Sequence, residues 1–384
     1  MPSLAPHISS VPESGIRRIL EISFELDDVV ALGVGEPDVP VAPHIAEAAI
    51  AAWHDDDTNY TPNGGIPQLR AAIVEKLARD NKIHVETEQV WVTVGATQGL
   101  HQAMALTLAA GDEVLVPDPG YTTFTMNARM LDAVPVPYSL RPDRDFIPSI
   151  DELERLVTDR TRVLIVNSPS NPLGVVFDES VLRELLEFAR RHDLWIISDE
   201  VYERFMFDAE HVSIASLDDD NRVFSAFSLS KTYAMTGIRV GYLVVPPGLA
   251  STMRTVQEAT ISCVSTPAQH AAVAAITGDQ SHVDAAMAHY RGNLDAVTAA
   301  LDERGIRYLP PRGAFYLWID VSHASGGDVA TWAEHLLLSQ KVAVAPGAAF
   351  GRSGEGWIRI CLAATREDLL TGVERLPVPA ATPK

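Results

Sequence analysis

The sequence predicts an α/β fold: a mainly parallel seven-stranded sheet with one antiparallel strand, helices on both of its faces, and a smaller α/β domain. Short β-branched, apolar runs alternate with helical segments from residue 90 onward. These runs are apolar throughout, as in strands that are buried on both faces. With 384 residues, 47% of them hydrophobic, the chain is long enough to bury one large core and one small core.

The first part of the chain is predicted to be an arm that contributes to the smaller domain. Apolar residues recur at helical spacing over residues 16–24, and residues 29–32 are predicted to form a strand. Two helices are then expected, at residues 43–53 and 68–80. We therefore expect an arm over residues 1–42, a large domain over residues 43–280 and a small domain over residues 281–384.

Seven apolar runs supply the strands of the large sheet. The seventh follows the sixth after only about a dozen residues, which leave no room for a crossover helix, so this strand is expected to be antiparallel. Residues 249–300 are Ala-rich and expected to be helical, with one break at 279–282. The expected strands are residues 90–94, 113–116, 134–136, 163–166, 194–197, 223–227 and 240–245; in the small domain, residues 307–309, 314–319, 342–344 and 357–360 surround a helix at 328–340.

Charge and cysteine content narrow the function. Thirty basic against 51 acidic residues give a net charge of −21, which argues against nucleic acid or an anionic membrane as a partner. Cys263 and Cys361 lie far apart and match no disulfide or metal spacing, so no metal site is predicted. Acidic residues in the first 30 positions argue against a targeting peptide, and no apolar run reaches membrane-spanning length. A cytoplasmic location is expected.

Polar residues follow the ends of several predicted strands, where open α/β sheets bind ligands. The glycines at Gly95 and Gly99 open a helix whose N–H groups can hold a phosphate, although a plain strand-to-helix turn has the same pattern. Tyr121, after the second strand, either stacks on a ring or packs in the core. Asn171, after the fourth strand, exposes an amide or serves only as a turn residue.

The fifth and sixth strands end in ionisable residues. Asp199 would be costly to bury without a cationic partner such as a pyridinium nitrogen, unless it only caps a helix. Lys231 follows the sixth strand among small hydroxyl residues, and Arg239 comes eight residues later, which suits a covalent amine and a phosphate ligand. A solvated surface lysine is the alternative. Arg359 interrupts an apolar run and is expected to face solvent or a carboxylate. Together these residues occur in the order that a pyridoxal phosphate site requires.

Nine motifs in order carry a family resemblance that covers nearly the whole chain. The sequence resembles the class I/II aminotransferases, which are fold-type I pyridoxal-phosphate enzymes of the aspartate aminotransferase superfamily. The matching stretches are GVGEPD (33–38), YTPNGGIPQLR (60–70), VTVGATQGL (92–100), PDPGY (117–121), NSPSNPLG (167–174), SDEVYERF (198–205), SLSKTYAMTGIRVGY (228–242), VAPGAAFG (344–351) and IRICLA (358–363).

The resemblance implies a role for each candidate residue. Lys231 would be the Schiff-base lysine, Asp199 would bind the pyridine nitrogen, and Tyr202 would bind the phenolic oxygen and serve catalysis with them. Tyr60 would reach the phosphate of the neighbouring subunit, which implies a homodimer with sites at the interface. The remaining cofactor residues would be Gly95, Ala96, Thr97, Tyr121, Asn171, Ser228, Ser230 and Arg239, and the substrate carboxylate would be bound by Arg359 with Gly35 and Asn171.

The implied function is transfer of an amino group from an L-amino acid to a 2-oxo acid such as 2-oxoglutarate. Relatives with acidic substrates carry a lysine about where Thr97 stands, so neutral or aromatic donors are favoured over aspartate. The alternatives are an aspartate aminotransferase, a C–S β-lyase or another Cα-activating enzyme of the same fold. A transcription regulator would need a basic DNA-binding module, for which residues 1–32 are too short and too acidic. A non-catalytic binder of the same fold is a further alternative, although no key residue is missing to support it.

Overall fold

The computed structural model describes residues 3–380 and is built around one seven-stranded sheet. The strand order is β2-β8-β7-β6-β5-β3-β4, and each predicted apolar run supplies one strand. The mixed α/β fold predicted from the sequence is confirmed. The strands are β2 (Val90–Thr93), β3 (Glu113–Asp118), β4 (Val134–Ser139), β5 (Thr161–Asn167), β6 (Trp195–Asp199), β7 (Val223–Ser228) and β8 (Gly241–Val244).

Strand β8 is the antiparallel member of this sheet. It pairs antiparallel with β7, where Ser228 lies opposite Gly241, and antiparallel with β2, where Thr93 lies opposite Gly241. The pairs β3–β4, β3–β5, β5–β6 and β6–β7 are parallel. The prediction from the short connection between the sixth and seventh runs is therefore confirmed.

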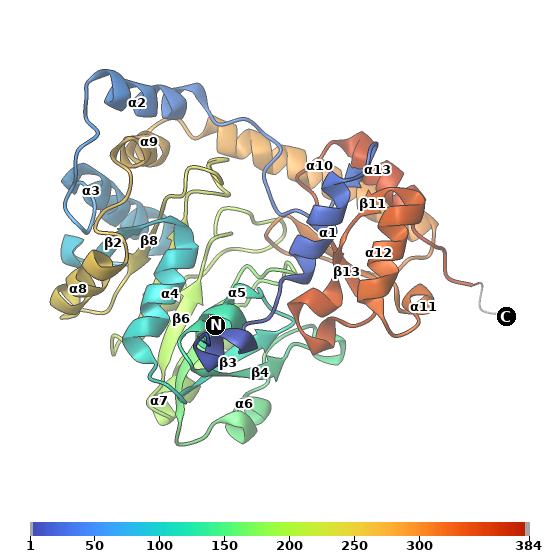
Figure 1. Ribbon diagram of the computed structural model, residues 1–384, viewed down its shortest axis with the longest axis horizontal. Helices are drawn as coiled ribbons and strands as arrows, with labels where there is room; N and C mark the ends of the chain where they lie inside the picture. Colours follow the sequence, from blue (N-terminus) through green and yellow to red (C-terminus); the bar gives the residue numbers. More distant parts are fainter. Residues whose placement is uncertain (1–2, 381–384) are drawn as a thin grey trace.

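Both faces of the sheet are buried. Alternate residues of each strand point to opposite faces, and helices cover both of them. Val114 and Val116 of β3 join a cluster with helices α4, α5 and α8, whereas Leu115 joins the cluster under α6 and α7. At the β2 edge, α2, α3 and α9 cover the second face and lie side by side in Figure 1. These helices are α2 (Pro43–His54), α3 (Pro67–Lys76), α4 (Gly95–Thr107), α5 (Thr123–Met130), α6 (Ile150–Leu156), α7 (Glu179–Arg191), α8 (Ala250–Thr260) and α9 (Thr266–Thr277).

The C-terminal part and the N-terminal arm form a smaller α/β unit on the right of Figure 1. Its sheet has the order β12-β13-β10-β9, and the arm strand β1 pairs in parallel with β11. The arm helix α1 packs against α12. The elements are α1 (Gly15–Phe24), β1 (Val30–Ala31), α10 (Ser281–Glu303), β9 (Tyr308–Leu309), β10 (Tyr316–Asp320), α11 (Ser322–Ser325), α12 (Val329–Gln340), β11 (Val342–Ala343), β12 (Ala345–Pro346), β13 (Trp357–Cys361) and α13 (Arg366–Glu374).

Several boundaries differ from the sequence-based expectation. The helical stretch after residue 249 has a second break between α8 and α9, and helix α13 was not predicted. Strand β4 continues to Ser139 despite prolines at 135 and 137, because it is an edge strand and needs fewer backbone donors. A short π-helix, η2 (Leu77–Asn81), continues α3. The short 3-10 helices are η1 (Pro6–Ser10), η3 (Thr87–Gln89), η4 (Pro142–Arg144), η5 (Ile214–Leu217), η6 (Gly347–Phe350) and η7 (Arg352–Gly354). Across residues 3–380, we find no helix both long and apolar enough to traverse a lipid bilayer.

Candidate active site

A pocket of about 350 Å³ lies where the carboxyl ends of the parallel strands meet the arm and the smaller sheet. Gly95 does not line this pocket but lies directly behind Arg239. Tyr60 lies outside it and is 92% exposed. The other predicted site residues all line the pocket: Gly35, Ala96, Thr97, Tyr121, Asn171, Asp199, Tyr202, Ser228, Ser230, Lys231, Arg239 and Arg359.

Lys231 projects into the pocket from the loop that joins β7 to β8. Its Nζ donates a hydrogen bond to the carbonyl oxygen of Gly35 at 2.5 Å, and no carboxylate of residues 3–380 pairs with it. Burial lowers the pKa of this amine to about 8, with the nearby guanidinium of Arg359 acting in the same direction and the thiol of Cys361 opposing it. About a tenth of the amine is therefore neutral, and so nucleophilic, at pH 7, far more than for an ordinary lysine.

Asp199 is the last residue of β6 and is 2% exposed. Its carboxylate accepts one long hydrogen bond, from the backbone N–H of Val201 at 3.4 Å, and within the described part of the chain it has no cationic partner. It does not cap a helix, because a turn follows it. Burial, reinforced by the neighbouring Glu200, raises the pKa of Asp199 to about 7. The site thus contains a buried acid that lacks a cation.

Arg359 of β13 is 2% exposed and lies between the rings of Tyr316 and Phe350, 4.2 and 4.9 Å from their centroids. Its Nη1 donates to Asn171 Oδ1 at 2.8 Å and its Nη2 to the Gly33 carbonyl at 2.6 Å. Its buried Nε has no partner among residues 3–380. Arg359 therefore does not face solvent, because the two rings exclude it, and no carboxylate of residues 3–380 pairs with it; a guanidinium with an unpaired donor remains.

A second cationic corner lies at the start of α4. The helix begins at Gly95, so the backbone N–H groups of Ala96 and Thr97 and the helix dipole favour an anion there. Arg239 lies beside it in the left-handed region, with φ at 63°, a costly conformation for a residue other than glycine. A Cβ on Gly95 would collide with the Arg239 guanidinium. Ser228, the last residue of β7, lines the same pocket, and this corner therefore suits a phosphate group.

Tyr316 is a site residue that the sequence analysis missed. It is 1% exposed, and its hydroxyl lies 2.7 Å from the hydroxyl of Tyr202. A Cβ at position 35 would collide with the same hydroxyl, so only glycine fits there. The only signal in the sequence is a tyrosine inside the apolar run 314–319, and this signal does not separate a site residue from a core residue.

The arm helix α1 also lines the pocket, through Ser14, Ile16, Arg17 and Leu20. Ser14 caps the helix by accepting the backbone N–H of Arg17 at 3.4 Å. This helix is predicted from the sequence, but not as part of the site. Its position depends on packing against α12 and β12, far away in the sequence, which local patterns do not encode.

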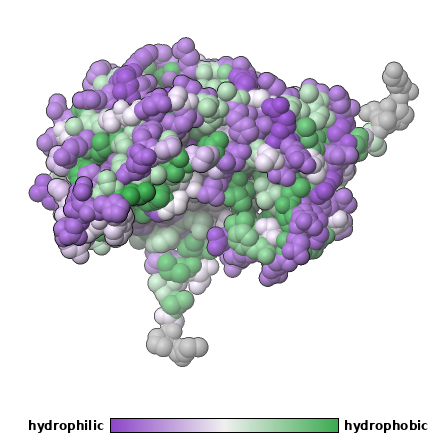
Figure 2. All heavy atoms as spheres, turned by 90° about the horizontal axis from the view of Figure 1, so that it is seen from above, coloured by the Kyte–Doolittle hydropathy of each residue, from purple (hydrophilic) through white to green (hydrophobic). Residues whose placement is uncertain are grey.

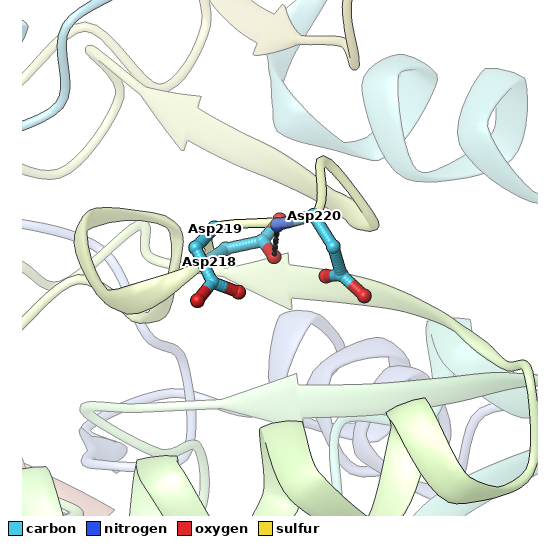
Figure 3. A group of neighbouring side chains, drawn as sticks. All are labelled: Asp218, Asp219 and Asp220. Atoms are coloured by element: carbon cyan, nitrogen blue, oxygen red, sulfur yellow. Dashed lines mark hydrogen bonds between the residues drawn. The ribbon is translucent and has the colours of Figure 1, made fainter.

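Within residues 3–380, three acidic side chains lie close enough to share a cation: Asp218, Asp219 and Asp220 (Figure 3). They precede β7, at the opposite end of this strand from Lys231. Asp219 pairs with Arg190, and Asp220 pairs with Arg222. Asp218 accepts three backbone N–H groups, from Asp220 at 3.2 Å, Arg222 at 2.8 Å and Val223 at 3.2 Å. Local partners already compensate these charges, so the group serves the loop before β7.

Comparison with known proteins gives one consistent family. The family model described as aminotransferase class I and II matches residues 27–376. An aspartate aminotransferase of Pyrococcus horikoshii is 35% identical over 97% of this chain and 96% of its own. Aromatic-amino-acid aminotransferase 2 of Thermococcus litoralis is 35% identical over 97% of both chains. The solved structure of aspartate aminotransferase from Thermus thermophilus with maleate is 34% identical, with a TM-score of 0.92 over 98% of this chain and 99% of that one.

Proposed function

The chain belongs to the class I and II aminotransferase family, and from that premise we propose that it uses pyridoxal 5'-phosphate to move amino groups from neutral or aromatic L-amino acids to a 2-oxo acid such as 2-oxoglutarate. The relatives described above are named aminotransferases, so a C–S β-lyase or another Cα-activating enzyme is not favoured.

One observation carries the proposal: an amine, an acid and a guanidinium face one pocket, and none has an ionic partner among residues 3–380. Lys231 hydrogen-bonds only a carbonyl oxygen, Asp199 accepts only one backbone N–H, and Arg359 retains an unpaired Nε. Such groups are costly to bury unless a ligand completes them. A cofactor with an aldehyde and a basic ring nitrogen, together with a substrate carboxylate, would complete all three.

The residues present fit pyridoxal phosphate. Asp199 would bind the ring nitrogen, because its carboxylate is buried and has no cationic partner among residues 3–380. Asn171 accepts a hydrogen bond from Arg359 through Oδ1, so its Nδ2 protons remain available to donate to the ring oxygen. The hydroxyl of Tyr202 would bind the same ring oxygen. Tyr121 would stack on the ring. Gly95, Ala96, Thr97, Ser228, Ser230 and Arg239 would surround the phosphate.

The protein's own side chains then divide the chemistry. Arg359 binds the α-carboxylate of the amino acid, helped by Asn171 and the backbone at Gly35, and so fixes the orientation of the Cα–H bond. When bound, the cofactor supplies an electron sink for the charge that develops at Cα. Lys231, with a pKa lowered to about 8, would take the proton from Cα as a base and then donate it to the cofactor carbon as an acid.

A panel of amino-acid donors with 2-oxoglutarate as acceptor tests the proposal. Because Thr97 supplies no charge at the start of α4, aromatic and neutral donors should give higher kcat/KM than aspartate. Stoichiometric formation of glutamate and the donor's 2-oxo acid is the expected product pattern. A strong preference for aspartate would overturn the donor assignment, and release of ammonia and pyruvate from cysteine conjugates would support a lyase.

We also propose a homodimer with shared sites. An apolar hollow of about 520 Å³ lies between α2, α9 and the loop that joins β7 to β8. Trp53, Ile50 and Ile238 line it and are 68, 53 and 50% exposed. Figure 2 looks down on the side of the molecule that carries α2 and α9 and shows hydrophobic side chains gathered between hydrophilic ones. A second copy of this chain would cover these side chains and bring its own Tyr60 close to the pocket.

A cytoplasmic location and the division of the chain complete the proposal. Cys263 and Cys361 are both unpaired in the structure, as suits a reducing compartment. We propose that the large cofactor-binding domain comprises residues 43–280, with the arm and residues 281–384 forming the small domain. The β1–β11 pair and the packing of α1 on α12 support this division. Limited proteolysis that releases a fragment ending near residue 280 would test it.

A further inference from the structure

Helix α1 places two consecutive arginines in two different cavities. Arg17 lines the active-site pocket, with Ile16 and Leu20 of the same helix beside it. Arg18 lines a neighbouring cavity and pairs with Glu334 through both Nε and Nη2. Arg18 is therefore committed to a carboxylate of α12, and only Arg17 lies at the pocket.

Arg17 lines the pocket but has no role in binding the cofactor or the α-carboxylate. Lys231, Arg239 and Arg359 are assigned to the cofactor and to the α-carboxylate. The contact of Arg17 with Glu21 is a single hydrogen bond, from Nε to Oε1 at 3.2 Å, and both side chains are about two-thirds exposed. An exposed pair of this kind contributes little to stability. Neither Nη atom of Arg17 makes a hydrogen bond within the part of the chain that the structure describes.

At the start of α4, the described residues offer no cation besides Arg239, which is assigned to the phosphate. Thr97 lines the pocket at the start of α4 and carries no charge. The net charge of −21 repels a substrate with two carboxylates unless a local cation compensates each of them. An arginine presents two parallel donors that match a carboxylate, so the free Nη pair of Arg17 has the required chemistry.

We propose that Arg17 binds the distal carboxylate of a dicarboxylic 2-oxo acid such as 2-oxoglutarate, and so determines acceptor specificity. The inference rests on the proposed function, because it assigns the substrate class of the same pocket. Ile16 and Leu20 give this wall an apolar surface as well. One helix thus offers an aromatic donor an apolar contact and offers the acceptor a charge.

Matched acceptors and matched arginines isolate this contact. 2-Oxoglutarate and 2-oxopentanoate have the same chain length and differ in the distal carboxylate. For Arg17→Gln we expect kcat/KM to fall about 10- to 100-fold with 2-oxoglutarate, the cost of one hydrogen-bonded charge pair, and to change less than about threefold with 2-oxopentanoate. Arg17→Lys should recover part of the loss. Arg18→Gln, the adjacent control, should affect both acceptors equally and weakly.

Equilibrium binding separates this inference from the proposed function. Titration calorimetry of the cofactor-loaded protein with glutarate and pentanoate should show tighter, salt-dependent glutarate binding in the unmodified chain. Arg17→Gln should remove that preference. Retention of the glutarate preference, or an equal loss for both acceptors, would overturn the role of Arg17. Absence of transamination with every donor would instead overturn the proposed function, and the glutarate titration would still decide the role of Arg17.

Discussion

The hydroxyl groups of Tyr202 and Tyr316 lie 2.7 Å apart and join the turn after β6 to strand β10. Both side chains are buried, and burial raises the pKa of each, so both hydroxyls remain protonated in the working range. The ring of Tyr316 also lies 4.2 Å from the Arg359 guanidinium. Tyr316 therefore connects a side chain assigned to the cofactor with one assigned to the substrate.

Two substitutions of Tyr316 should separate these connections. Tyr316→Phe keeps the ring against Arg359 and removes the hydroxyl, so kcat should fall about tenfold while KM for the amino acid stays within about threefold. Tyr316→Leu removes the ring as well, and KM should then rise at least about tenfold because Arg359 loses its stacking partner. Steady-state kinetics provide both values. Identical effects of the two substitutions would contradict this division.

The lowered pKa of Lys231 predicts the pH dependence of cofactor attachment. Only the neutral amine reacts with an aldehyde, so attachment of pyridoxal phosphate to the cofactor-free protein should accelerate with pH up to about 8 and then level off. A solvated lysine would keep accelerating to about 10.4. Borohydride reduction and peptide mass spectrometry at each pH measure the yield. Lys231→Ala should abolish the adduct and turnover, whereas Lys82→Ala, at an exposed position, should change neither.

Asp199 should destabilise the cofactor-free protein at neutral pH. Its folded pKa is raised to about 7 from an ordinary value of 3.8, so the folded state binds more protons between these values. Stability from this group is therefore complete below about pH 4 and is lost as pH rises through 7. Asp199→Asn should remove this dependence and make the cofactor-free chain more stable at pH 8, while it lowers turnover at least about 100-fold. Urea unfolding at pH 5 and 8 compares the two proteins, and parallel pH profiles would contradict the prediction.

Much of the fold is visible in the sequence because its strands are buried on both faces. The run at residues 163–166 is apolar at each position, since Leu164 and Val166 pack on one face while Val163 and Ile165 pack on the other. The direction of β8 could be predicted from the short connection between β7 and β8. The break between α8 and α9 was missed although the sequence carries a local signal for it: Pro267 lies in the first turn of α9, where proline is typical of a helix start.

The site was predictable where it follows strand ends and was missed where it depends on docking. Asp199 ends β6, and Lys231 and Asn171 follow β7 and β5 within a few residues, so the topology of one sheet brings them together. Tyr316 belongs to a different sheet, and Arg17 to an arm helix, and both reach the pocket only because the smaller unit packs against the large sheet. No local pattern distinguishes Arg17 from Arg18, although the structure gives them different cavities.

The exposure of Tyr60 predicts complementation between two defective chains. Tyr60 is 92% exposed and lies outside its own pocket, so we expect it to act on the phosphate at the other subunit's site. Tyr60→Ala should reduce activity about 10- to 100-fold, and Lys231→Ala should abolish it. A hybrid dimer would then hold one site with both residues intact: Lys231 from the Tyr60→Ala chain and Tyr60 from the Lys231→Ala chain.

Mixing the two purified variants under conditions of subunit exchange should therefore restore activity, up to about half that of the unmodified dimer for each hybrid. If Tyr60 served its own subunit, each site of the hybrid would carry one defect and mixing would restore nothing. A second mixture, of Lys231→Ala with Asp199→Asn, provides the control, because both residues belong to the same pocket and each hybrid should contain one defective site of each kind. Recovery in the first mixture but not in the second identifies Tyr60 as the residue that crosses the interface.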